Sequence, residues 1–180
     1  MAYELISSKL MGPYYGNSLY VWSAVLTSTL GGLALGYFAG GQVSKNKPLK
    51  WLRLVLGFSA IFFLAAPYLS ATIMEATLSM SVKSGAFISS LLYIFPVLVA
   101  FGFVSPILIK LITKNEANVG KNAGTIYTIS TLGGIFVSLI TGFYLIPEIG
   151  LRTSSLLGGV VLLIAFALSL TIKNDYAKDE

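Results

Sequence analysis

Five long apolar stretches, separated by short segments that hold most of the charged residues, dominate the sequence. They cover residues 18–41, 51–74, 87–112, 123–146 and 154–172. A helix needs about 20 mostly apolar residues to cross a bilayer, and its backbone must satisfy its own hydrogen bonds there. The pattern predicts an all-α fold: a polytopic membrane helix bundle with about five transmembrane helices, in a single transmembrane domain over residues 1–180.

The low content of charged residues supports a membrane protein. Only 11% of the 180 residues are charged and 56% are hydrophobic, whereas about 25% of a soluble domain is charged. The net charge of +5 does not indicate nucleic-acid binding, because the basic residues lie between apolar spans, where they act as topology signals. No short apolar region is followed by a small-residue cleavage site, so we expect no removable signal peptide.

The basic residues concentrate in alternate connecting segments. Nine follow the first, third or fifth span, and three lie in the other segments. The nine are Lys45, Lys47, Lys50, Arg53, Lys110, Lys114, Lys121, Lys173 and Lys178, and the three are Lys9, Lys83 and Arg152. Because basic loops stay on the cytoplasmic side, we predict a multi-pass protein of the bacterial cytoplasmic (inner) membrane, with its N-terminus outside and its C-terminus in the cytoplasm.

Two local features qualify the simple span pattern. Residues 3–16 form a short amphipathic segment that cannot cross a bilayer, and Gly12 and Pro13 separate it from the first span. We expect either an interfacial helix or the remnant of a longer helix. In the third span, Pro96 and Pro106 each lack a backbone N–H, so we expect kinks there.

Small residues recur at every fourth position in two spans. They are Ser28, Gly32, Gly36 and Gly40 in the first span, and Ser130, Gly134, Ser138 and Gly142 in the fourth. Residues four apart share one helix face, and small side chains there let a second backbone approach closely. The spacing does not match a phosphate-binding glycine loop. We therefore predict two helix-packing faces, with a further small-residue pattern at 154–159 in the fifth span.

The pentapeptide STLGG occurs twice, at residues 28–32 and 130–134. The two copies lie in spans that are predicted to run in opposite directions. Many transporters are built from inverted repeats, whereas membrane sequences of low complexity also match by chance. Both interpretations of the repeat stay open at the level of the sequence.

The sequence holds few residues that could perform catalysis. It has no cysteine, no histidine and only seven acidic residues. Catalysis needs positioned acid–base groups or an activated nucleophile, so we predict no enzymatic activity, no cofactor and no metal site. The polar candidates are Glu4, Glu75, Tyr127, Glu148 and Arg152. The charged ones lie near predicted span ends, where a charge is usually solvated.

Several motifs in order resemble the membrane domain of spermidine synthase-like proteins. They are ELISSKLMGPYYGNSLYVW, GLALGYFAGGQVS, FPVLVAFGFVSPILIKL and GTIYTISTLGGIFVSLITGFYLIPEIGLR, which together lie between Glu4 and Arg152. In that family a multi-span region similar to the major facilitators is often joined to a cytoplasmic aminopropyltransferase domain. The resemblance implies that this chain is such a membrane module.

The chain departs from the family pattern at several points. Lys9 and Lys110 stand where the family usually has Arg, and Ser44 stands where it often has Asp. The family commonly has a further apolar helix before Glu4, and its soluble synthase domain has no counterpart, since only KNDYAKDE follows the last span. The resemblance therefore implies a membrane module without its enzyme.

Two functions fit these observations. We favour an integral membrane accessory or scaffold subunit that acts with a partner, either another membrane or cytoplasmic protein or a second copy of the chain. The alternative is a small-solute or polyamine transporter that works as an oligomer. Transport of a cation would favour carboxylates inside the bundle, and the predicted span centres contain none. Beyond the lipid bilayer, the sequence identifies no specific partner, and we expect no nucleic acid.

Overall fold

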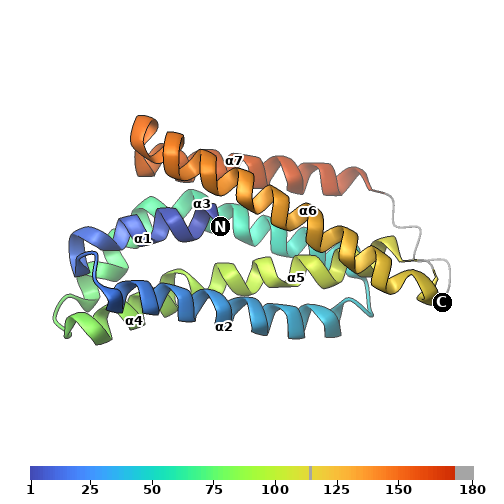
Figure 1. Cartoon of the computed structure of the whole chain (residues 1–180), viewed down its shortest axis with the longest axis horizontal. Helices are drawn as coiled ribbons and strands as arrows, with labels where there is room; N and C mark the ends of the chain where they lie inside the picture. Colours follow the sequence, from blue (N-terminus) through green and yellow to red (C-terminus); the bar gives the residue numbers. More distant parts are fainter. Residues whose placement is uncertain (114, 173–180) are drawn as a thin grey trace.

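The computed structural model describes residues 1–113 and 115–172, and these residues form an all-helical bundle without strands. The elements are α1 (Ala2–Tyr15), α2 (Leu19–Val43), α3 (Pro48–Thr77), α4 (Val82–Tyr93), α5 (Phe95–Ile112), η1 (Glu116–Asn118), α6 (Val119–Ile140), η2 (Thr141–Ile149) and α7 (Gly150–Thr171). Figure 1 shows that the long helices run side by side along the long axis. The predicted fold class is confirmed.

Four helical segments in the described residues are long and apolar enough to cross a membrane: Leu19–Val43, Pro48–Thr77, Phe95–Ile112 and Glu116–Thr171. The last segment contains both the fourth and the fifth predicted spans. It continues through the π-helical η2 and folds back there, so that α6 and α7 lie in opposite directions (Figure 1). These apolar helices fit a multi-pass membrane protein.

The third predicted span, 87–112, is two helices in the structure. α4 ends at Tyr93 and α5 begins at Phe95, with Pro96 in its first turn. Pro96 lacks an N–H, which a first helical turn does not need but a helix interior does. The helix therefore breaks before Pro96, whereas α5 continues through Pro106.

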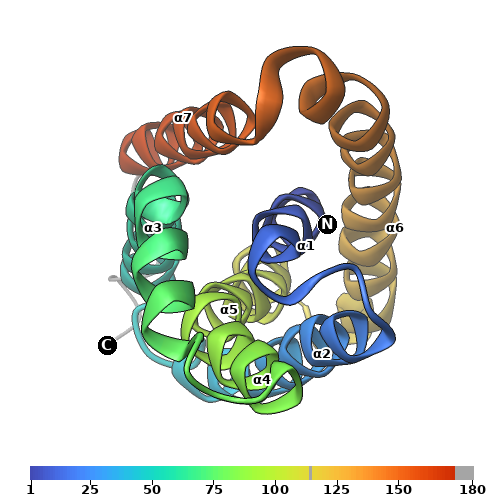
Figure 2. The same ribbon diagram turned by 90° about the vertical axis from the view of Figure 1, so that its left-hand side faces the viewer.

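α1 lies inside a ring that the other helices form around it (Figure 2). Tyr3, Ile6 and Met11 of α1 are at most 1% exposed. The ring of Tyr3 packs on that of Phe63 in the middle of α3, with 4.8 Å between centroids. The structure thus does not support an interfacial helix for this segment, because its apolar side chains find a larger buried surface inside the bundle than at its edge.

The small-residue face of α2 packs directly against α5. A methyl group on Gly36 would lie 2.7 Å from the Cα atom of Gly102, and one on Gly40 would lie 2.7 Å from the Cα atom of Phe103. At the start of the seam, the hydroxyl of Ser28 lies 2.8 Å from that of Ser90 in α4. The predicted face on α2 is therefore a contact within the chain, between backbones that only glycine allows so close together.

The second seam joins α3 to α7 and satisfies a backbone carbonyl that proline leaves free. Pro67 lies inside α3 and has no N–H to donate to the carbonyl oxygen of Phe63, four residues earlier. The hydroxyl of Ser155 in α7 donates a hydrogen bond to this oxygen at 2.7 Å. At the other end of the seam, the guanidinium group of Arg53 donates to the carbonyl oxygens of Ser169 and Ile172 and so caps α7.

We predict that Gly36→Ala destabilises the protein by about 1–3 kcal/mol, because the added methyl group overpacks a contact between two backbones. Gly41→Ala is the matched control on the same helix, since no atom of the described residues lies within 4 Å of the added methyl group. Thermal unfolding in detergent measures both variants. Equal melting temperatures for the two variants would show that the seam does not need glycine.

Candidate functional site

A cavity of about 550 Å³ lies beside α1 inside the ring of helices. Its wall is built from α1, α2, α3, α5, α6, η2 and α7, and most of it is apolar. The polar side chains that line it include Glu4, Tyr37, Ser105 and Ser130. Such a space can accommodate an apolar body that carries one or two polar groups.

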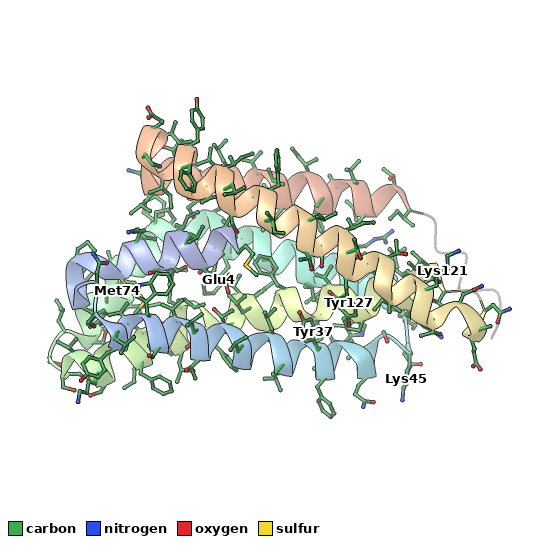
Figure 3. All side chains as sticks on the ribbon, viewed as in Figure 1. Glu4, Tyr37, Lys45, Met74, Lys121 and Tyr127 are labelled. Atoms are coloured by element: carbon green, nitrogen blue, oxygen red, sulfur yellow. The ribbon has the colours of Figure 1, made fainter. Side chains whose placement is uncertain are left out.

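The carboxylate of Glu4, the one that lines this cavity among the described residues, lies partway along the bundle, between its two ends (Figure 3). The side chain of Glu4 is 18% exposed, and one carboxylate oxygen lies 3.1 Å from the amino group of Met1. We expected Glu4 near a span end, and this expectation is wrong. α1 inserts into the ring, so the first turn of that helix lies at the depth of Phe63 in the middle of α3.

The small-residue face of α6 differs from that of α2. α6 has no buried residue. Ser130 and Gly134 line the cavity. Among the described residues, a methyl group on Gly134 would meet only a side-chain atom of Met1, at 3.2 Å, and one on Gly142, in η2, would meet no atom within 4 Å. Ser138 is half-buried. In the described residues, this face therefore meets no second helix backbone, because the cavity occupies the space where one would lie.

The remaining polar candidates do not converge on Glu4. Glu75 and Glu148 are exposed on α3 and η2, and Tyr127 is 49% exposed on α6. Arg152 of α7 donates a hydrogen bond to the hydroxyl of Tyr68, and its guanidinium carbon lies 5.0 Å from the centre of that ring. Sequence reasoning did not single out Tyr37 and Ser105, because a lone polar residue in an apolar span has no pattern that marks it as facing a cavity.

The site offers little that could hold a metal ion. The described residues contain no group of three or more acidic, histidine or cysteine side chains that could bind one. Thr141, also on the cavity wall, is 1% exposed, and its hydroxyl oxygen has no hydrogen-bond partner in the described part of the chain. The chemistry of the site in the described residues is therefore that of one carboxylate paired with the amino group of Met1, together with several hydroxyl groups, on an apolar wall.

Comparisons of the chain with protein-family models, with curated proteins and with solved structures find no match. The resemblance to the membrane domain of spermidine synthase-like proteins thus stays a prediction from the quoted motifs.

Two buried threonines should respond in opposite ways to replacement of the hydroxyl group by a methyl group. The hydroxyl of Thr77 donates to the carbonyl oxygen of Ile73 at 2.9 Å and lies 2.7 Å from the hydroxyl of Ser89. We predict that Thr77→Val lowers stability by about 1–3 kcal/mol, since it leaves buried partners unsatisfied. Thr141→Val removes an unpartnered hydroxyl and should leave stability unchanged or raise it.

Thermal unfolding in detergent measures both threonine variants. A loss of stability in Thr141→Val as large as that in Thr77→Val would contradict the assignment, because it would mean that the hydroxyl of Thr141 has a partner in solution.

Proposed function

We propose that this chain is an integral-membrane accessory subunit of a bacterial cytoplasmic membrane, which holds a membrane partner against the cavity side of α6. The observation that carries the proposal is the small-residue face of α6 around Ser130 and Gly134, which lines a cavity and, in the described residues, lies against no second helix backbone. In membrane helices such a face serves close packing with another helix.

The other small-residue faces of the bundle support this proposal. Gly36 and Gly40 of α2 contact the backbone of α5, and a methyl group on Gly159 of α7 would lie 3.2 Å from the backbone nitrogen of Leu64 in α3. Where two helices of the chain meet closely, glycine thus lies at the contact. α6 has the same spacing at Ser130 and Gly134 without such a contact in the described part of the chain, so its small residues are not explained by packing within the bundle.

The position of Glu4 favours a second candidate, a transporter of small cations such as polyamines that works as an oligomer. A carboxylate at mid-depth of a membrane bundle is costly and commonly marks an ion or substrate path. Glu4 lines a cavity of about 550 Å³, which is large enough for a small solute. Under either candidate, we propose that the chain performs no covalent chemistry itself.

Gly134→Leu should separate the two functions. A leucine side chain there enters the cavity and blocks a close helix contact, while the seams between α2 and α5 and between α3 and α7 stay intact. We predict that a stoichiometric partner co-purifies with the parent chain in mild detergent and is lost from Gly134→Leu, whose melting temperature stays within a few degrees of the parent. Gly124→Leu on the same helix is the control, because Gly124 does not line the cavity.

Purified chain that binds no partner would contradict the subunit proposal. Uptake of labelled spermidine into proteoliposomes that contain only this chain, abolished by Glu4→Gln and retained in Glu75→Gln, would establish the transporter instead.

The proposed orientation rests on the end of the bundle where basic residues gather. Lys45 and Lys121 lie at the same end (Figure 3), and Lys47 lies in the same loop as Lys45; Lys114, Lys173 and Lys178 lie outside the described residues. Because the chain has no cysteine, single cysteines can be probed in intact cells with an impermeant thiol reagent. We predict labelling of Lys83→Cys and protection of Lys47→Cys and Lys121→Cys. The reverse pattern would invert the topology.

A further inference from the structure

A second hollow is lined by residues of α2, α3 and α5. Figure 2 shows that α3 and α5 lie side by side in the bundle. The hollow is a groove of about 460 Å³, and the side chains that line it are all apolar. They include Leu35, Trp51, Leu54, Phe58, Val99 and Phe103. Leu35, Leu54 and Phe58 are 48%, 54% and 41% exposed, so the groove opens towards the surroundings of the bundle and not into its interior.

The groove shares no lining residue with the cavity beside α6. What binds in the groove therefore does not depend on the proposed function of the cavity.

One end of the groove carries positive charge. Trp51, Leu54 and Phe58 lie on one face of α3, since they are three and four residues apart. Lys50 precedes Leu54 by four residues in α3 and so shares this face one turn nearer to the end of the bundle, and Lys47 is the loop residue directly before the helix. Both lysines are exposed, and neither forms an ion pair with another of the described residues.

The groove is short enough to lie within one leaflet of a bilayer. Trp51 and Phe58 are seven residues apart, which is about 10 Å along a helix, and one leaflet contributes about 15 Å of hydrocarbon. The ring of Trp51 lies near the charged end and packs on Phe103, with 6.4 Å between centroids. Tryptophan favours the boundary between headgroups and hydrocarbon, so the charged end of the groove lies at headgroup level.

We propose that this groove binds an anionic glycerophospholipid, with the phosphate at the ammonium groups of Lys47 and Lys50 and one acyl chain along the apolar wall. Each lysine near an anionic membrane surface contributes attraction that a zwitterionic headgroup lacks. A transmembrane helix from a partner is a poor occupant, because it spans both leaflets whereas the groove lies within one.

The chain allows a direct test, since it contains two tryptophans, Trp22 and Trp51. In the Trp22→Phe variant, Trp51 is the single indole fluorophore. This variant is reconstituted into bilayers of dioleoylphosphatidylcholine that contain increasing fractions of phosphatidylglycerol or phosphatidylcholine with brominated acyl chains. Bromine quenches indole fluorescence on contact, so the two titrations give the relative affinity of the two lipids at the groove. We expect phosphatidylglycerol to bind at least about fivefold more tightly.

Two further variants attribute this preference to the lysines. Lys47 has a φ of 53°, a left-handed conformation that asparagine tolerates, so the test uses Lys47→Asn together with Lys50→Gln. We expect the double variant to lose the preference, and Lys121→Gln on α6 to keep it. In the Trp51→Phe variant, Trp22 reports on α2 at the opposite end and should be quenched equally by both lipids.

Equal quenching of Trp51 by the two lipids would overturn the proposal. A preference for phosphatidylglycerol that survives Lys47→Asn with Lys50→Gln would also overturn it. So would a preference for phosphatidylglycerol at Trp22 as large as the one at Trp51.

Discussion

The hydrocarbon of a bilayer offers no water to hydrogen-bonding groups, and this constraint accounts for most of the specific contacts in the bundle. A carbonyl oxygen that proline frees must find another donor, as that of Phe63 does in the hydroxyl of Ser155. The hydroxyl of Tyr3 donates a hydrogen bond to the carbonyl oxygen of Tyr93. The hydroxyl of Tyr93 in turn donates to the carbonyl oxygen of Ala66. Polar side chains that could suggest a reaction centre thus serve to tie helices together.

Close contact between helix backbones is the second consequence of a hydrocarbon environment. Since lipid chains are as apolar as leucine, helices in a membrane associate through dispersion contacts and hydrogen bonds, both of which require short distances. Gly36 and Gly102 meet these requirements where α2 crosses α5. The face of α6 around Ser130 and Gly134 has the same composition but borders a cavity.

The two hollows of the bundle differ in charge and in position. The inner cavity carries the carboxylate of Glu4 partway along the bundle, and the outer groove lies near two exposed lysines, Lys47 and Lys50, at the start of α3. Carboxylates attract cations or hydrogen-bond donors, whereas the lysines attract phosphate. The proposed partner or solute and the proposed lipid would therefore occupy separate places on the same small protein.

The sequence by itself determined the helical class, the approximate spans and the small-residue face of α2, because hydropathy and four-residue spacing are local properties of a chain. It also indicated which loops share one end of the bundle. Tertiary structure alone decided that residues 3–16 insert into the ring, since this depends on the space that the other helices leave. For the same reason, only the structure placed Glu4 partway along the bundle and the small-residue face of α6 beside a cavity. The faces of α2 and α6 have the same spacing of small residues but differ in what lies opposite them, and no local sequence pattern encodes this difference.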